Sequence, residues 1–220
     1  MDAEWRTRTR ASYDAVADEY VRRIFDELRH KPLDRALLDR FATRLRGAGP
    51  VCDIGCGPGH VARYLHERGV QVCGIDLSPA MVAQARRLNP GLDFCPGDMC
   101  ALEMHDGALA GIVAFYAVIH IPRPDVVRAL CELRRVLQPG GSLLLAFHVG
   151  DDALHLDEWW GHEVAVDFVF FHPDEMAGYL RAAHFEIEEI VERPPYPDVE
   201  HQSRRAYVIA RKPLPAAEPR

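Results

Sequence analysis

The chain has 220 residues, 48% of them apolar, and a formal net charge of −7. A chain of this length suits one α/β domain with accessory elements and buries roughly two thirds of its extended surface. Its acidic balance gives no basic field to collect phosphates, which disfavours nucleic-acid partners. The longest apolar run, 108–119, has 12 residues, and roughly 20 are needed to cross a bilayer.

The N-terminus, the cysteines and the histidines bear on where the protein acts and on whether it binds a metal. The start, Met1 to Glu4, is unlike a signal peptide, so we expect a cytoplasmic protein with no membrane partner. The six cysteines contain no C-x-x-C pair, which is typical of buried reduced thiols. Among the 11 histidines, His155 and His162 are too far apart for the one-turn ligand pair of a helical metal site. We therefore expect no metal.

Two helical patterns occupy the first 46 residues. Apolar positions recur at three- and four-residue steps, as in helices with one buried face. They are Tyr13, Val16, Ala17, Tyr20, Ile24 and Leu28 in the first pattern, and Leu33, Leu37, Phe41 and Leu45 in the second. Both helices are expected to lie on a sheet or over its edge.

Segment 51–59 reads Val-Cys-Asp-Ile-Gly-Cys-Gly-Pro-Gly, and a helical pattern follows from His60. It predicts a buried strand that ends in a loop with glycine at every second position. Because glycine has no Cβ, Gly55, Gly57 and Gly59 allow a sharp turn and let a ligand lie against the main chain. The segment favours a nucleotide-like cofactor, although a tight strand-to-helix turn without a ligand fits the same glycines.

Strands and helices then alternate. We expect strands at 70–75, 92–95, 111–116 and 142–148, and helices at 78–88 and 125–137, with a Pro-Gly-Gly break at 139–141. Ser78 and Pro79 are a suitable N-cap and first helical residue. This alternation predicts a parallel sheet with helices on both faces.

The last third of the chain has a different pattern. Residues 150–172 are irregular and aromatic, and a helix is expected near 173–183. Two strands, 185–192 and 205–211, are expected to form an antiparallel hairpin with a long connection. The tail 213–220 is rich in Pro and Ala and is expected to be disordered.

The spacing of the glycines separates two classes of cofactor. A dinucleotide-binding loop has its third glycine three residues after the second, where this chain has His60, and Asp53 precedes the first glycine by two residues. This acid-x-Gly-x-Gly-x-Gly order resembles motif I of the class I S-adenosylmethionine (SAM) dependent methyltransferases. Further signatures of that family follow in order, namely Asp76, Gly97-Asp98-Met99, Phe115-Tyr116-Ala117-Val118-Ile119-His120 and Leu137-Gln138-Pro139-Gly140-Gly141.

The four signatures cover residues 51–148, and the resemblance to small-molecule methyltransferases extends to the N-terminus, where Tyr13-Asp14-x-x-Ala17-x-x-Tyr20 looks like the aromatic helix that closes over SAM. It implies an α/β fold with a doubly wound, Rossmann-like, seven-stranded, mostly parallel sheet, an antiparallel last strand and N-terminal cap helices. It also implies a single methyltransferase domain over 1–212, with the cap helices in 1–46 and a substrate cover in 150–172. SAM is then the cofactor and a small organic molecule the methyl acceptor, and we expect a monomer or homodimer.

The resemblance also assigns cofactor contacts. The glycine loop wraps the methionine portion, Asp76 accepts from the ribose hydroxyls, and Asp98 accepts from the adenine amine between Leu77 and Met99. Arg22 or Lys31 would partner the methionine carboxylate. The complete set is Tyr20, Asp53, Gly55, Gly57, Gly59, Asp76, Leu77, Asp98, Met99, Tyr116 and His120. Standing alone, Asp98 also fits a turn aspartate, and Tyr20 a core-facing member of the helical pattern.

Catalysis by such a protein rests mainly on alignment of the acceptor with the methyl group. If the acceptor is a hydroxyl, His120 or His148, at the ends of predicted strands, is placed to take its proton; both also fit packing roles. The expected substrate contacts are Tyr13, Trp159, Trp160, Phe171 and Arg205. Alternation from Val164 to Phe170 fits an extra strand equally well, and Arg205 also fits a solvated surface charge.

The sequence also argues against some methyl acceptors and leaves two rival functions to consider. Methyltransferases of this class that act on adenine or glutamine amides carry Asn/Asp-Pro-Pro-Tyr/Phe after the fourth strand, where this chain has Tyr-Ala-Val-Ile at 116–119. The rivals are a SAM-binding protein with other chemistry and a nucleotide-dependent oxidoreductase. His60 and the missing long second half of dinucleotide folds disfavour the oxidoreductase.

Overall fold

The computed structural model describes residues 4–215. Its main sheet has seven strands in the order β3-β2-β1-β4-β5-β9-β8. They are β1 (Val51–Ile54), β2 (Val72–Asp76), β3 (Asp93–Pro96), β4 (Leu109–Phe115), β5 (Leu137–His148), β8 (Glu186–Arg193) and β9 (Arg205–Arg211). Strand β9 is antiparallel to both of its neighbours, β5 and β8, and the other strand pairs of this sheet in the described chain are parallel. The doubly wound, mostly parallel sheet predicted from the sequence is confirmed.

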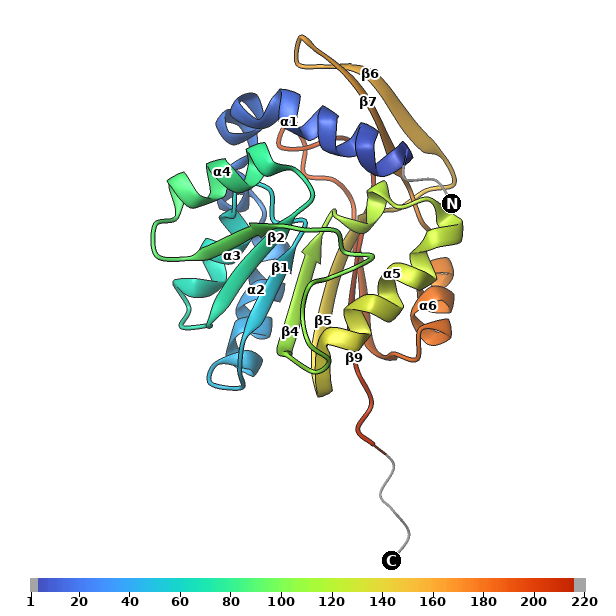
Figure 1. Ribbon diagram of the computed structural model, residues 1–220. Helices are drawn as coiled ribbons and strands as arrows, with labels where there is room; N and C mark the ends of the chain where they lie inside the picture. The colour runs from blue at the N-terminus through green and yellow to red at the C-terminus, as the bar shows by residue number, and fades with distance from the viewer. Residues whose placement is uncertain (1–3, 216–220) are drawn as a thin grey trace, which may run out of the picture.

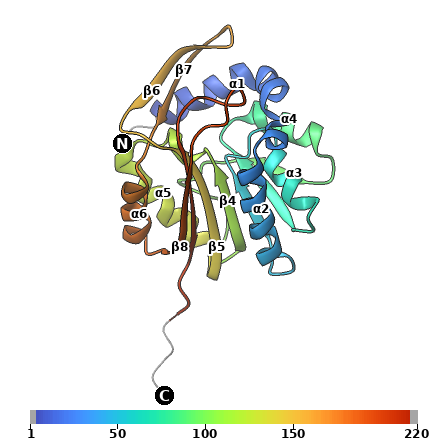
Figure 2. The same cartoon turned by 180° about the vertical axis from the view of Figure 1, so that it is seen from behind.

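Helices cover both faces of the sheet, as Figures 1 and 2 show. One face packs against α2 (Pro32–Leu45), α3 (His60–His66) and α4 (Pro79–Leu88), and the other against α5 (Arg123–Val136) and α6 (Pro173–Ala182). Successive β5 residues point to opposite faces, so Leu143 and Leu145 belong to one core and Leu144 to the other. A strand covered on both sides is apolar throughout, which explains the continuous run 143–147.

The first helix does not lie on the sheet. Helix α1 (Glu4–Ile24) crosses the carboxyl ends of the strands beside a two-stranded hairpin of β6 (Ala153–Trp159) and β7 (His162–Val169) (Figure 1). Val16 and Ala17 of α1 pack with Val164 and Val166 of β7. The expectation of an irregular segment at 150–172 was therefore wrong, and the alternating pattern there marks an extra strand.

Short 3-10 turns complete the chain. They are η1 (Glu27–His30), which contains the Leu28 assigned to the first helical pattern, and η2 (Val118–His120), directly after β4. Residues 213–215 of the expected disordered tail are described without regular structure, and 216–220 lie outside the described residues.

The start of α4 shows how local sequence anchors the cap helix. The Ser78 hydroxyl accepts the Met81 N–H (3.1 Å) as a side-chain N-cap and donates to the Asp14 carboxylate of α1 (2.6 Å). The Ala80 N–H also donates to Asp14 (3.1 Å). The predicted N-cap is confirmed, and it also joins α1 to the sheet domain.

Removal of this hydroxyl is expected to destabilise the fold. Loss of a Ser N-cap costs about 1 kcal/mol, and the bond to Asp14 is lost with it, so Ser78→Ala should lower the free energy of unfolding by about 1 to 2 kcal/mol in urea titrations. Thr43→Ala is the control, because the exposed Thr43 hydroxyl bonds only its own helix carbonyl at Asp39. Equal effects of the two substitutions would contradict the role given to Ser78.

Candidate active site

A cavity of about 720 Å³, open to solvent on one side, lies under α1 at the carboxyl ends of β1, β2, β3 and β4. Ten residues predicted from the sequence line it together, namely Tyr13, Tyr20, Gly55, Gly57, Asp76, Leu77, Asp98, Met99, Tyr116 and His120. Parallel strands end at one edge of a sheet, which is why residues so distant in sequence meet.

The three glycines have different tasks. Gly55 and Gly57 line the cavity, with φ values of +68° and +51° that residues with a side chain rarely adopt. Gly59 (φ +79°) is the N-cap of α3, and a Cβ there would lie 2.7 Å from the Phe94 ring. The third glycine therefore brings α3 close to the sheet, and the first two expose their backbone to the cavity.

Asp53 lies beneath the glycine loop and does not line the main cavity. Its carboxylate is 1% exposed and accepts the Ala62 N–H (3.0 Å) in the first turn of α3. Burial raises the pKa of this carboxyl to about 8, although the Ala62 hydrogen bond opposes the shift. Asp53 borders a smaller adjoining cavity together with Tyr20 and Glu27.

Asp76 joins the loop to the end of β2. Its two carboxylate oxygens accept the N–H groups of Gly57 and Ser78, each at 2.8 Å. Burial raises the pKa of Asp76 to about 6, and these two hydrogen bonds limit the rise. Each carboxylate oxygen has a second lone pair, so Asp76 can still accept from hydroxyl groups in the cavity.

The opposite end of the cavity contains Asp98, together with Trp5 and Thr9 of α1, which the sequence analysis did not predict. Asp98 accepts the Cys100 N–H (2.8 Å) and lies 2.7 Å from Arg6 Nε. Trp5 lines the cavity, and its indole N–H is buried without a hydrogen-bond partner among residues 4–215. Trp5 and Thr9 extend the buried face of α1 toward its N-terminus. Polar Thr9 and Ser12 on that face hid the signal.

Tyr13 and His120 form a buried hydrogen-bonded pair at the aromatic end. The Tyr13 hydroxyl lies 2.7 Å from His120 Nε2, and His120 Nδ1 lies 2.9 Å from the Asp167 carbonyl oxygen. A carbonyl only accepts, so Nδ1 carries the proton and Tyr13 donates to Nε2. Burial lowers the pKa of His120 to about 4 and raises that of Tyr13 well above its usual value.

Of the predicted substrate contacts, Trp159 and Trp160 lie beside tyrosines of the cavity, whereas Phe171 does not. Trp159 packs edge-on against Tyr13 and Tyr20, with ring centroids 5.4 and 5.9 Å apart, and Trp160 lies 6.0 Å from Tyr20. Phe171 does not reach the cavity. It is fully buried in the main core, where it packs against Phe147.

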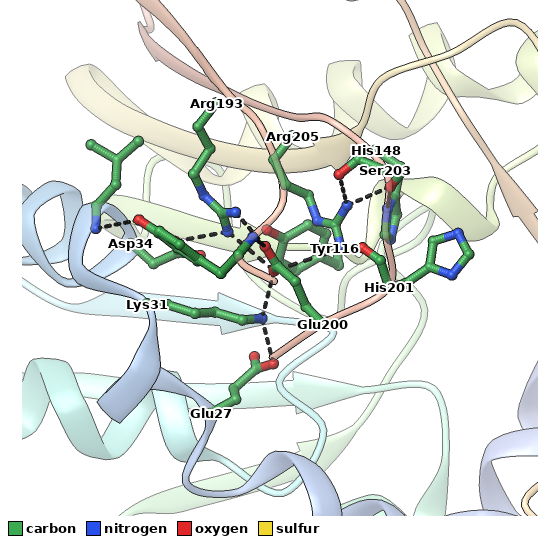
Figure 3. Close-up of polar contacts among 12 residues, drawn as sticks. Glu27, Lys31, Asp34, Tyr116, His148, Arg193, Glu200, His201, Ser203 and Arg205 are labelled. Atoms are coloured by element: carbon green, nitrogen blue, oxygen red, sulfur yellow. Dashed lines mark hydrogen bonds and ion pairs between the residues drawn. The ribbon is translucent and has the colours of Figure 1, made fainter. Parts of the chain in front are cut away.

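Arg205 is also not a surface charge. It is 2% exposed, and its guanidinium donates to the His201 and Ser203 carbonyl oxygens. Figure 3 shows it in a buried network with Lys31, Arg193, Asp34, Glu27 and Glu200. A buried ion needs a partner of opposite charge, and each of the three cations here is close to a carboxylate of this set.

This ion network surrounds the ring of Tyr116, which has a φ of +56°. Lys31 Nζ lies 5.5 Å and Arg205 Cζ 5.6 Å from the ring centroid. Lys31 bonds Glu27 (2.6 Å) and Glu200 (3.3 Å), so its charge is already paired. Burial raises the pKa of Glu27, but Lys31 and His60 outweigh it and lower the pKa to about 2. Arg22, the other cation expected near the cofactor, is exposed and pairs with Glu19.

His148 lies on the other side of Tyr116 and does not line the main cavity. Its Nδ1 lies 2.7 Å from the Ser203 hydroxyl, and its ring stacks on Phe170 at 5.0 Å. Burial, together with the nearby charge of Arg205, lowers the pKa of His148 to about 2. It lines a second pocket with Trp159 and His201.

Comparison with known proteins agrees with this geometry. Residues 51–141 match the family model described as a methyltransferase domain. This match supports the resemblance of the segment to the class I SAM-dependent methyltransferases. The chain is 32% identical over 149 residues to malonyl-[acyl-carrier protein] O-methyltransferase of Enterobacter lignolyticus, covering 66% of this chain and 58% of the relative. It is 30% identical over 150 residues to demethylmenaquinone methyltransferase of Renibacterium salmoninarum, covering 63% and 62%.

The chain thus spans about three fifths of the length of these curated relatives. Among solved structures, a putative methyltransferase in complex with the Haloferax volcanii Trm112 activator has a TM-score of 0.72 at 22% identity, covering 95% of this chain and 99% of that chain. Magnesium protoporphyrin IX methyltransferase of Synechocystis with bound SAM has a TM-score of 0.69 at 18% identity, covering 96% and 100%. At these identities the structures show the fold of this chain and nothing about its activity.

The residues that line the main cavity fit SAM. Its walls offer an unpartnered buried N–H from Trp5, two carboxylates that retain free lone pairs, and exposed backbone at Gly55 and Gly57. Within residues 4–215 no group of three or more His, Cys, Asp or Glu is arranged to hold a metal ion. None of the helices in that range is both long and apolar enough to span a bilayer.

The burial of Asp53 predicts a pH dependence of stability. Its pKa rises on folding, so between about pH 4 and pH 8 the native state holds a proton that the unfolded chain lacks. Stability from this group is therefore lost as pH rises through that window, by up to about 1.4 kcal/mol per pH unit. Asp53→Asn keeps an acceptor for the Ala62 N–H and removes the titration.

The measurement is the free energy of unfolding of both proteins at pH 5, 6, 7 and 8. We expect Asp53→Asn to gain stability relative to the natural chain as the pH rises. A difference that stays constant with pH would show that Asp53 is ionised in the native state throughout.

Proposed function

We propose that this protein transfers a methyl group from SAM to oxygen, nitrogen or carbon of a small organic acceptor. The observation that carries the proposal is the convergence of Asp76, Asp98 and the Gly55–Gly57 backbone on one cavity at the carboxyl edge of the sheet. SAM supplies an activated methyl group on a sulfonium, and its sulfur leaves as a neutral thioether. The protein therefore has to bind, orient and exclude water more than activate the donor.

Each part of the cavity suits one part of SAM. Asp76 accepts from hydroxyls of the ribose, and Asp98 accepts from the adenine amine. Leu77 and Met99 supply apolar surface for the adenine ring, and both line the cavity. The positive φ values of Gly55 and Gly57 keep the loop free of side chains where the methionine portion lies. Helix α1 lies over these residues and contributes Trp5, Thr9 and Tyr13 to the cavity wall.

The first test is binding of S-adenosylhomocysteine, the demethylated product. A hydrogen bond to a charged group contributes roughly 1.5 to 3 kcal/mol, or about 10- to 150-fold in affinity. We expect Asp98→Ala to weaken binding by about that factor in calorimetric titrations, and Asp76→Ala to weaken it measurably. Asp93→Ala is the control, because Asp93 is an exposed carboxylate at the start of β3, the strand that leads to Asp98. Unchanged affinity in both site variants would overturn the assignment.

Proton removal from a hydroxyl acceptor is assigned to the Tyr13 and His120 pair. Because the pKa of His120 is lowered to about 4, the imidazole is neutral near pH 7, and its unprotonated Nε2 accepts the hydrogen bond of the Tyr13 hydroxyl. The Asp167 carbonyl fixes the Nδ1–H tautomer. The Tyr13 hydroxyl would relay the acceptor's proton to Nε2. His148 is less suited, since it lies outside the main cavity.

The relay predicts a separation of catalysis from binding. Tyr13→Phe keeps the ring contacts but removes the hydroxyl, so we expect methyl transfer from labelled SAM to a pool of metabolites to fall about 100-fold. The affinity for S-adenosylhomocysteine should stay within about twofold. Tyr64→Phe, which removes a hydroxyl bonded to Asp39 far from the cavity, is the control. Full activity of Tyr13→Phe would exclude the relay.

The resemblance to the family leaves the acceptor class open. The relatives named above act on a malonyl-[acyl-carrier protein] and on demethylmenaquinone, which differ in charge and shape. The acceptor class therefore has to be inferred from the residues of this chain.

A further inference from the structure

A second pocket lies beside the cofactor cavity, between the β6–β7 hairpin and the ends of β5 and β9. It is partly open to solvent. Its lining residues are His148, Leu154, Leu156, Trp159, Phe168, Phe170 and His201. None of them is an acid, a lysine or an arginine, and five are apolar.

Ring surfaces form most of the wall. The His148 ring is stacked on Phe170, with centroids 5.0 Å apart and planes 16° apart, and His201 packs edge-on against His148 at 6.0 Å. Trp159 and Phe168 meet at 87° with centroids 5.4 Å apart. Such a wall favours a planar ring, which can stack on one face and pack edge-on against another.

The cations around this pocket are already bonded to the protein. Arg205, behind His148, donates to the main chain at 201 and 203 and lies 3.6 Å from Glu200. Lys31 pairs with Glu27 and Glu200. Arg204 pairs with Glu192, and Arg123 donates to the Phe170 carbonyl and to Glu175.

The His148 ring does not supply a fixed charge in the interior of the pocket. The pKa of His148 is lowered, by burial and by Arg205, so that its ring is neutral at physiological pH. His201 is exposed at the rim. An acceptor carboxylate that entered this pocket would lose water without gaining a free cationic partner, which is unfavourable. An uncharged ring has no such cost.

Two layers of rings in contact separate the pocket from the cofactor cavity. His120 contacts Phe168 (5.0 Å), Tyr13 contacts Trp159 (5.4 Å), and Tyr116 contacts His148 (5.3 Å). Trp159 is half-buried at the end of β6 and touches residues of both walls. Trp159 is therefore the pocket residue that packs against both Tyr13 and Tyr20 of the cofactor cavity.

We propose that this second pocket binds the methyl acceptor and that the acceptor is a planar, uncharged aromatic compound. The proposal rests on the proposed methyl-transfer function, which it deepens. The ring lies between the hairpin and the His148–Phe170 stack, and Trp159 is the wall toward the cofactor. The pocket disfavours carboxylates because each nearby cation described above is already bonded to groups of the protein.

Three probes of similar size test the proposal by calorimetry at pH 7 with saturating S-adenosylhomocysteine. They are 2-naphthol, which is flat and neutral, 2-naphthoate, which is flat and anionic, and decahydro-2-naphthol, which is neutral and saturated. We expect 2-naphthol to bind at least tenfold more tightly than either of the others. It should bind without displacing S-adenosylhomocysteine, because the two ligands occupy different cavities.

Two matched variants locate the binding. Leu154 lines the pocket and is 37% exposed, whereas Ile190 on β8 is 38% exposed and lies outside it. We expect Leu154→Asp to weaken 2-naphthol binding at least tenfold and Ile190→Asp to leave it unchanged. Both should bind S-adenosylhomocysteine as the natural chain does, which shows that they are folded.

The results separate the two proposals. A protein with no affinity for S-adenosylhomocysteine would contradict the proposed function. The three probes can then be titrated without S-adenosylhomocysteine, and this still tests what the pocket binds. Equal or tighter binding of 2-naphthoate or decahydro-2-naphthol, displacement of S-adenosylhomocysteine by 2-naphthol, or insensitivity to Leu154→Asp would each overturn the inference about the acceptor.

Discussion

The site depends on the hydrogen bonds from the Gly57 and Ser78 N–H groups to the Asp76 carboxylate. They tie the loop after β1 to the end of β2 and to the start of α4, and the same Ser78 hydroxyl bonds Asp14 of α1. The Asp76 carboxylate thus holds the glycine loop in place, and the nearby Ser78 hydroxyl holds helix α1 over the cavity. Because Asp76 is buried and its pKa is raised, the arrangement costs free energy near neutral pH, as is common where binding and not stability sets the residue.

The parts of the fold that follow from local pattern were predictable. Ser78 with Pro79 marked the start of α4, and the apolar run 143–147 marked a strand buried on both faces. Asp76 and Asp98 could be assigned to one site because parallel strands end at one edge. Their distance in sequence did not matter, since the sheet order brings β2 and β3 side by side.

Other parts depend on packing that no local pattern specifies. Residues 150–172 form a hairpin because Val164 and Val166 find apolar partners on α1, a contact between distant segments. Asp53 lies under the loop although its position in the motif suggests a ligand contact. Arg205 and Phe171 were expected at the substrate but are held in the ion network and the main core. The pairing of Arg6 with Asp98 needs α1 to cross β3's end, which sequence spacing does not indicate.

The most direct measurement of the central claim is a crystal structure of the full chain with S-adenosylhomocysteine. The account predicts the ligand in the cavity under α1, with its ribose hydroxyls on Asp76, its adenine amine on Asp98 and its amino-acid portion along Gly55 and Gly57. Ligand density elsewhere, or carboxylates turned away from the ligand, would contradict it.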